Sequence, residues 1–356
     1  MAERIGILTG GGDCAGLNTV IASIVKAGIP MGYEFIGFEK GWEGVLDPMM
    51  YRELTRAEVR GISHLGGTFL GTTNRGRFGA KVGDGEVNRI PKDILDMAKR
   101  NLDSLGITGL IVLGGDGTLS GALQLAERGI KLIGVPKTID NDLHSTDRTF
   151  GFSTAVDVAV DAFDKIHTTA TSHQRTIFIE CMGRHTGWIA LEAGLAGNAH
   201  AILLPEFPFS ISELAAFLKR RNDEGMPSIV CVAEGITIER DLKHDHTSSE
   251  VQLAGSAHMV MQLVEQELPG ELEMRTVVLG HTQRGGSPNA ADRILAKRFG
   301  VAAMQAYREG RFNHMVSLRS NQIVLQPIGE AVADLKRVTE ETPELQTARA
   351  LGVFVN

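Results

Sequence analysis

The sequence has only three cysteines among its 356 residues, and none lies near another. Cys14, Cys181 and Cys231 form no CxxC pair, so the spacing supports neither a zinc ribbon nor a disulfide scaffold and indicates buried thiols, which suit a reducing compartment. No apolar run approaches the length of a membrane span, and the N-terminus passes straight into a strand pattern without a basic leader. We therefore expect a cytoplasmic protein that does not bind a membrane.

The sequence also lacks a net positive charge. The 36 Lys and Arg residues are outnumbered by 43 Asp and Glu, which gives a formal net charge of -7. This balance argues against binding to nucleic acid, because such proteins usually need a basic face, but it is compatible with a local basic pocket for a phosphorylated metabolite. A chain of this length is expected to form two domains.

Short apolar runs that end in glycine-rich loops alternate with helical patterns. The first three runs cover residues 5–8, 110–113 and 132–135. The second half repeats the style, with strands expected at 176–180, 201–204, 228–233 and 276–279. Helices are expected at about 17–27, 119–127, 154–168, 189–195, 211–221, 255–266 and 289–308. This alternation predicts an α/β fold of two Rossmann-like three-layer domains with mainly parallel sheets, and an active site in the cleft between them.

The glycine-rich loops are candidates for phosphate binding. The loop at 10–18 lacks the Walker and dinucleotide-binding spacings, so alone it fits either an anion site at a helix N-terminus or a tight turn. The loop GGDGT at 114–118 places Asp116 directly after a buried run, where its carboxylate can hold Mg²⁺ while Gly117 leaves room beside a phosphate chain. The structural alternative is a helix cap made by Asp116 or Thr118.

A second polar loop follows the next apolar run. PKTIDND at 136–142 contains Asp140 and Asp142, either of which can orient an acceptor hydroxyl and receive its proton. Lys137 adds a positive charge that can reach a transferring phosphoryl group. The structural alternative is an Asx-rich turn after a proline. Beside the Asp116 loop, we favour phosphoryl transfer.

Several arginines stand near expected strand ends or glycine turns. They are Arg175, Arg184, Arg275 and Arg284, and Glu234 follows another expected strand. Arginine forks bind phosphate through two hydrogen bonds, so a convergence of these residues would form a sugar-phosphate pocket. Taken singly, an arginine is more often a solvated surface residue, and spacing alone does not bring the four together.

Taken together, these motifs resemble the bacterial-type 6-phosphofructokinase family from about residue 5 to beyond residue 298. The strings that carry the resemblance, in the family's order, are GGDCAGLN, GGTFLGTTNRGRF, GGDGT, PKTIDND, SHQR, MGRHTGW and LGHTQRGGSP. The resemblance implies Mg²⁺-dependent transfer of a phosphoryl group from ATP to the 1-hydroxyl of fructose 6-phosphate. It also implies a nucleotide-binding domain at 1–150 plus about 283–333, and a fructose 6-phosphate-binding domain at 151–282 plus about 334–356.

The resemblance assigns roles to matching residues. Asp140 is implied as the base, with Thr138, Asp142, Arg184 and Lys137 as the other catalytic residues. The implied phosphate-donor residues are Gly11, Arg75, Gly115, Asp116, Gly117 and Thr118, with Asp116 as the metal ligand. The implied sugar-phosphate residues are Thr138, Asp140, Asp142, Arg175, Met182, Gly183, Arg184, Glu234, Arg275, His281 and Arg284. In the family, Arg175 and Arg275 come from a neighbouring subunit, which implies a homotetramer or homodimer with shared active sites.

The chain departs from the family pattern in its donor residues. Lys137 is usual in pyrophosphate-dependent members, whereas Gly117 is the ATP-type residue, since pyrophosphate users carry an aspartate there that would crowd the α-phosphate. A steric block discriminates more sharply than an added charge, so we expect ATP, with pyrophosphate as the alternative donor. Asn74 occupies the usual position of a nucleotide-contacting arginine, so Arg75 or Arg77 is expected to replace it.

Two further alternatives stay open at this point. An NAD or lipid kinase also carries GGDGT, although the later strings do not belong to that pattern. A catalytically inactive, nucleotide-binding regulatory subunit is the alternative outside the enzymes, and the presence of both Asp116 and Asp140 argues against it.

Overall fold

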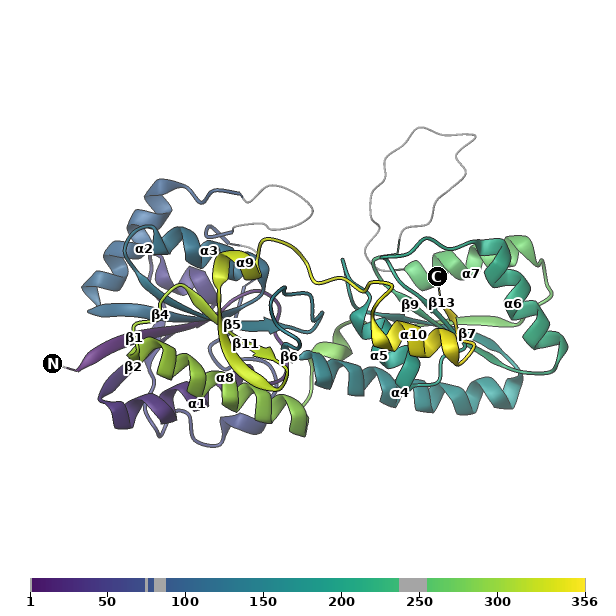
Figure 1. Cartoon of the computed structure of the whole chain (residues 1–356), viewed down its shortest axis with the longest axis horizontal. Coiled ribbons are helices and arrows are strands. Elements are labelled where there is room, and N and C mark those ends of the chain that lie inside the picture. The colour runs from purple at the N-terminus through teal and green to yellow at the C-terminus, as the bar shows by residue number, and fades with distance from the viewer. Residues whose placement is uncertain (1, 74–75, 80–87, 237–254, 356) are drawn as a thin grey trace. The chain divides into compact units, whose positions relative to one another are not determined.

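The chain forms two compact units. A computed structural model describes residues 2–73, 76–79, 88–236 and 255–355. The first unit comprises Met1–Thr154 and Arg284–Leu335, and the second comprises Ala155–Gln283 and Lys336–Asn356. The chain thus passes between the units three times, first within the N-terminal turn of helix α4 (Phe152–His173) (Figure 1). The predicted α/β class is confirmed, while the ligand assigned to each domain stays a prediction.

The first unit is built on a mainly parallel sheet with the strand order β12-β11-β5-β4-β1-β2-β3. Helices α2 (Lys92–Ser104) and α3 (Asp116–Ala126) cover one face, and α1 (Leu17–Gly28) and α8 (Ala290–Arg308) cover the other (Figure 1). The strands are β1 (Glu3–Thr9), β2 (Tyr33–Phe38), β3 (Tyr51–Glu53), β4 (Ile107–Gly114), β5 (Lys131–Thr138), β11 (His314–Arg319) and β12 (Gln322–Pro327), with β6 (Phe150–Gly151) pairing with the end of β5. Only the edge strands β3 and β12 pair antiparallel among these described strands.

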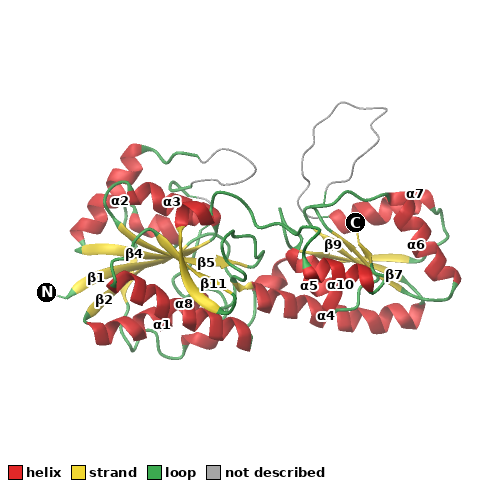
Figure 2. Ribbon diagram, in the orientation of Figure 1, coloured by secondary structure: helices red, strands yellow, loops and turns green. Residues whose placement is uncertain are grey.

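The second unit contains a parallel sheet with the strand order β10-β7-β9-β8-β13. Helices α6 (Ile211–Asp223) and α7 (Ser256–Glu267) lie on one face, and α4 and α5 (Trp188–Ala196) lie on the other (Figure 1). Figure 2 shows the same layering, with yellow strands between red helices. The strands are β7 (Thr176–Cys181), β8 (Ala201–Leu203), β9 (Ser228–Ala233), β10 (Met274–Val278) and β13 (Phe354–Val355).

The apolar runs form the core because the central strands are covered on both faces. Strands of such a sheet read as continuous hydrophobic runs rather than as alternating patterns. In β1, for example, Ile5, Ile7 and Leu8 are fully buried, and all six residues of β7 and of β9 are buried. The remaining helices are η1 (Ile29–Met31), η2 (Gly41–Val45), η3 (Ile62–His64), η4 (Gly280–Arg284), α9 (Ile328–Ala331) and α10 (Pro343–Ala350).

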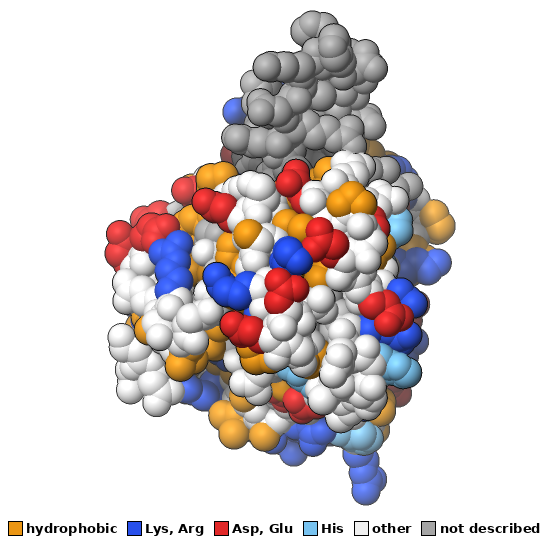
Figure 3. Space-filling model, turned by 90° about the vertical axis from the view of Figure 1, so that its right-hand side faces the viewer, with side chains coloured by type: hydrophobic (Ala, Val, Ile, Leu, Met, Phe, Trp, Pro, Cys, Tyr) orange, Lys and Arg blue, Asp and Glu red, His pale blue; other side chains and the backbone are white. Residues whose placement is uncertain are grey.

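The face of the molecule drawn in Figure 3 is mixed in charge. On the face drawn in Figure 3, Lys and Arg side chains are interspersed with Asp and Glu. Within the described ranges, the structure has no helix long and apolar enough to cross a membrane.

Candidate active site

Three loops of the first unit meet because their strands are neighbours. Strands β1, β4 and β5 lie side by side and run parallel, so the loops after them emerge at one edge of the sheet. The Gly10 N–H donates to Leu113 O (2.9 Å), which joins the first glycine-rich loop to the end of β4. The structure therefore brings the two glycine-rich loops predicted to bind phosphate together with the loop at 136–142, which carries the predicted base.

Glycine is required at two positions where the loop backbone packs against the side chain of Thr118, because a Cβ there would overlap with it. A Cβ at Gly10 would lie 2.5 Å from the Thr118 side chain, and a Cβ at Gly114 would lie 2.3 Å from it. Gly11 has a φ of +77°, and its position lies beside the Lys137 ammonium. The glycines thus let two backbone loops close around one buried threonine.

Asp116 opens helix α3 at this edge. Burial and the neighbouring Asp142 charge raise the pKa of the Asp116 carboxyl to about 6, while the hydrogen bond from the Gly117 N–H and the charge of Lys137 act in the opposite direction. That hydrogen bond is 2.7 Å long, so Asp116 satisfies one amide of the first helical turn, as the capping alternative expects. The N-cap residue of helix α3 is Gly115, which has no side chain to cap the helix.

The donor set at this edge suits Mg²⁺. Asp116 and the nearby Asp142 carry hard carboxylate oxygens, and Mg²⁺ bound with phosphates needs only one or two protein carboxylates. In the described part of the chain, no group of three or more His, Cys, Asp and Glu side chains is placed to hold a metal ion. A metal here would therefore complete its coordination with phosphate oxygens and water.

Lys137 is buried at the centre of the cluster. The residue is 4% exposed, and its ammonium donates to the Gly12 carbonyl in the first loop. Burial lowers the pKa of Lys137; Arg284 acts in the same direction, while Asp140 and Asp142 act against it. The lysine thus places a positive charge between the β1 loop and the two aspartates.

The turn that carries Asp140 and Asp142 is held by hydrogen bonds, two of which come from Thr149 further along the chain. The Asp140 N–H donates to Thr138 Oγ1 (3.1 Å), and the Thr149 hydroxyl donates to Thr138 O (2.8 Å). Asn141 is 3% exposed in a left-handed conformation (φ 51°), and its Oδ1 accepts a hydrogen bond from the Thr149 N–H (3.1 Å). Sequence reasoning missed Thr149, and no motif marked it.

Arg284 belongs to the first unit and lies against the β1 loop. Its Nη1 donates to Asp13 O (3.2 Å), and a Cβ at Gly12 would lie 2.6 Å from the same nitrogen. The structure therefore brings this predicted sugar-phosphate arginine together with the loops predicted to bind the donor.

In the second unit, predicted sugar-phosphate residues gather at the carboxyl ends of β7 and β9. Met182 and Gly183 follow β7, Glu234 follows β9, and the Gly183 N–H donates to Glu234 Oε1 (3.4 Å). Arg184 is exposed on the same loop, and His281 is exposed on η4, which follows β10. The structure brings Met182, Gly183 and Glu234 together, and their role in binding the sugar phosphate stays a prediction.

Arg175 and Arg275 lie at the other end of these strands, at the amino ends of β7 and β10. Arg175 precedes β7, Arg275 stands near the start of β10, and both bind Glu273 Oε1 (2.6 and 3.1 Å). The six residues of β7 span about 20 Å, so one chain cannot fold these two arginines into a pocket with Met182 and Glu234. Within one chain, Arg175 and Arg275 are therefore separated from Met182 and Glu234, which agrees with the neighbouring-subunit origin that the resemblance implies for these two arginines.

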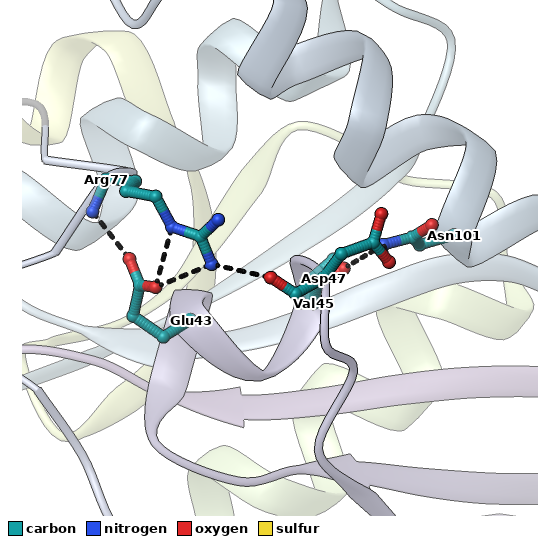
Figure 4. A network of polar contacts seen from close by, with 5 residues as sticks. All are labelled: Glu43, Val45, Asp47, Arg77 and Asn101. Atoms are coloured by element: carbon teal, nitrogen blue, oxygen red, sulfur yellow. Dashed lines mark hydrogen bonds and ion pairs between the residues drawn. The ribbon is translucent and has the colours of Figure 1, made fainter.

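Arg75 falls outside the described residues, whereas Arg77 is held by η2. Its Nε and Nη2 donate to Glu43 Oε2 (3.1 and 3.0 Å), and Nη2 also donates to Asp47 O (3.1 Å) (Figure 4). The Asn101 amide donates to Asp47 Oδ1 (3.0 Å) and to Val45 O (2.9 Å), which ties the same turn to α2. The guanidinium of Arg77 therefore anchors its own segment.

Glycine loops, a buried lysine and paired carboxylates at the ends of parallel strands are the arrangement expected of an α/β phosphotransferase. The structure of Pichia pastoris phosphofructokinase in the T-state resembles this chain with a TM-score of 0.81 and 31% sequence identity, and the match covers 99% of this chain and 37% of that one. This chain thus spans little more than a third of the Pichia protein. The phosphofructokinase family model matches residues 4–307, and the chain belongs to that family.

Two bacterial relatives of similar identity carry different names. The ATP-dependent 6-phosphofructokinase of Chloroflexus aurantiacus is 47% identical over 352 residues, which cover 99% of this chain and 97% of that protein. The pyrophosphate–fructose 6-phosphate 1-phosphotransferase of Streptomyces coelicolor is 46% identical over 343 residues, which cover 94% of this chain and 96% of that protein. Overall identity therefore does not by itself separate the two donors.

Proposed function

We propose that the chain is an ATP-dependent 6-phosphofructokinase. It would transfer the γ-phosphoryl group of ATP to the 1-hydroxyl of D-fructose 6-phosphate and release fructose 1,6-bisphosphate and ADP, the committed step of glycolysis. The observation that carries this proposal is the meeting of the Asp116 loop with Lys137, Asp140 and Asp142 at neighbouring strand ends. The name of the Chloroflexus relative supports it.

The proposed reaction assigns a step to each catalytic residue. The sugar hydroxyl oxygen attacks the γ-phosphorus, the bond to the β–γ bridging oxygen breaks, and the hydroxyl proton passes to the Asp140 carboxylate. Thr138 and Asp142 support that carboxylate, and the hydrogen bond from the Asp140 amide to Thr138 supports this role. Lys137 and Arg184 stabilise the charge that develops on the transferring group.

The donor site in this proposal is formed by the glycine-rich loops. Gly11, Gly115, Gly117 and Thr118 line the donor phosphates, and Asp116 holds Mg²⁺. When bound, Mg²⁺ neutralises charge on the phosphate oxygens. Arg75 stays a predicted donor contact.

The acceptor site requires a second copy of the chain. Met182, Gly183, Arg184, Glu234, His281 and Arg284 bind the sugar phosphate in one subunit, and Arg175 and Arg275 bind the 6-phosphate held by its neighbour. These two arginines lie at the amino ends of β7 and β10, away from Met182 and Glu234, and this position supports their assignment to the neighbouring subunit's site. We therefore propose a homotetramer or homodimer with shared active sites.

Shared sites can be tested by complementation. Chains carrying Asp140→Asn and chains carrying Arg275→Ala are each expected to lose activity as pure oligomers. Mixed oligomers, formed by co-expression, regain some sites with both residues intact. An absence of regained activity in purified hybrids would contradict the sharing of sites.

A pyrophosphate-dependent enzyme of the same fold is the second candidate. Lys137 and the Streptomyces relative favour it, whereas Gly117 favours ATP because glycine would put no carboxylate beside the α-phosphate of a bound nucleotide.

A cytoplasmic location belongs to the same proposal, supported by three free, buried cysteines.

The reaction itself is tested by phosphorus NMR of the products formed from fructose 6-phosphate, Mg²⁺ and ATP. A new phosphate ester at carbon 1 together with ADP is the expected result. Saturable nucleotide binding without any product would favour the inactive regulatory subunit instead.

A further inference from the structure

The loop that carries Arg184 is held between two carboxylates. This arginine loop, residues 182–188, begins where the Gly183 N–H donates to Glu234 Oε1 (3.4 Å). It ends where the Gly187 N–H donates to both carboxylate oxygens of Glu206 (2.9 and 3.1 Å). Arg184 lies between the two attachments with its side chain exposed. Glu234 belongs to the predicted sugar-phosphate site, whereas Glu206 has no role in the reaction described above.

Glu206 stands just beyond strand β8 and binds backbone amides from two distant segments. Besides Gly187, it accepts a hydrogen bond from the Val338 N–H (3.2 Å). Burial raises the pKa of Glu206, and the hydrogen bonds from Gly187 and Val338 act in the opposite direction. A Cβ at position 187 would lie 2.9 Å from Glu206 Oε2, so glycine lets the loop approach the carboxylate this closely.

Residues 336–338, here called the strap, contact the arginine loop through three hydrogen bonds or ring contacts. The Trp188 indole N–H donates to Lys336 O (2.7 Å), and the Lys336 ammonium lies over the ring of Trp188, 5.2 Å from its centroid. Arg337 Nη1 donates to His185 O (3.1 Å). Glu206 therefore joins the strap and the arginine loop through one side chain, all within the second unit.

The opposite side of the arginine loop is closed by backbone. A Cβ at Gly235 would lie 2.0 Å from Arg184 O, so the loop packs directly on the chain that follows β9. The backbone at Arg184 is thus fixed by packing on one side and by Glu206 and the strap on the other. Catalytic geometry is sensitive to such supports, because a misplacement of about 1 Å can cost about 10²-fold in rate.

We infer that Glu206 is a positioning residue for phosphoryl transfer: it fixes Gly187 and the strap so that Arg184 is presented to the substrate in one geometry. The inference rests on the proposed function, since Arg184 acts on the transferring phosphoryl group only in that reaction. Glu206 itself contacts backbone amides, so it acts through the loop.

The test compares Glu206→Ala with Glu206→Gln in the full-length chain. We expect Glu206→Ala to lower kcat/KM for fructose 6-phosphate about 10- to 10²-fold, with the KM for ATP changed less than about threefold. Glu206→Gln keeps one acceptor oxygen and should recover most of the loss. Glu267→Ala, an exposed glutamate at the end of α7 in the same unit, is the matched control and should behave as wild type.

Hydrogen exchange supplies a readout that does not depend on turnover. Glu206→Ala should speed exchange at the amides of Gly187 and Val338, while the central strands of the second unit stay protected. If Glu206→Ala fails to fold, Arg337→Ala removes the bond to His185 O and should give a smaller loss in the same direction.

Each outcome decides a different claim. An active wild-type enzyme with unchanged kcat/KM in Glu206→Ala would overturn the positioning role. Equal losses in Glu206→Ala and Glu206→Gln, with general loss of protection, would also overturn it and leave a purely structural residue. An inactive wild-type chain would instead remove the proposed function, and the inference with it.

Discussion

Gly235→Ala should damage catalysis by pushing the Arg184 backbone aside. The added Cβ would lie 2.0 Å from Arg184 O, whereas real Cβ atoms essentially never approach another atom within 3.0 Å. The carbonyl must therefore retreat by about 1 Å, and Arg184 moves with it. A displacement of this size lowers kcat/KM by about 10²-fold, which equals about 2.7 kcal/mol of transition-state stabilisation. Overpacking should also lower the free energy of unfolding by about 1–3 kcal/mol.

Steady-state kinetics and denaturant unfolding measure the two effects separately. Gly329→Ala, in helix α9, is the matched control, because a Cβ there meets no atom within 4 Å. It should leave the kinetics unchanged and should not lower stability, since alanine is favoured over glycine in a helix. A folded Gly235→Ala enzyme with wild-type kcat/KM would refute the claim that the placement of the arginine loop limits turnover.

Three further predictions concern the first unit. Asp140→Asn should lower kcat about 10²- to 10⁴-fold with KM for fructose 6-phosphate nearly unchanged, and near-normal turnover in the same assay would remove Asp140 as the base. Gly117→Asp should raise the KM for ATP far more than that for pyrophosphate, and an equal loss of both donors would contradict the steric argument. Because burial and Asp142 raise the pKa of Asp116 to about 6, this carboxyl is ionised above that pH and protonated below it. The Mg²⁺ concentration for half-maximal activity should therefore rise as the pH falls from 7 to 5, and a flat profile would exclude Asp116 as the metal ligand.

The sequence predicted the elements whose hydrophobic pattern is continuous. The runs at 110–113 and 132–135 became the centres of β4 and β5, and the helix expected at 289–308 matches α8 closely. Strands β2 and β11 were missed because their apolar residues are broken by glycine, serine or charged positions. Such strands are recognised only once their neighbours in the sheet are known.

The sequence predicted the donor-side loops better than the contacts that hold them. Parallel strands bring their carboxyl ends to one edge, so the approach of Asp116 to the loop at 136–142 followed from the strand pattern alone. The support of that loop by Thr149 depends on a left-handed Asn141, which no local pattern announces. The grip of Glu206 on Gly187 joins segments that only the tertiary fold brings together.

The positions of the arginines could be predicted from the sequence only in part. Arg175 precedes an expected strand, whereas Met182 follows it, so their placement at opposite edges was implicit in the strand assignment. Arg284 could not be placed in this way, because its position against Gly12 and Asp13 depends on a chain that returns to the first unit after 129 residues in the second.

The most direct test of the proposed function measures fructose 1,6-bisphosphate formed from fructose 6-phosphate and Mg²⁺ with either ATP or pyrophosphate as the sole donor. We expect turnover with ATP and little or none with pyrophosphate. Turnover with pyrophosphate alone would contradict ATP as the donor, and no product with either would contradict the proposed enzyme altogether.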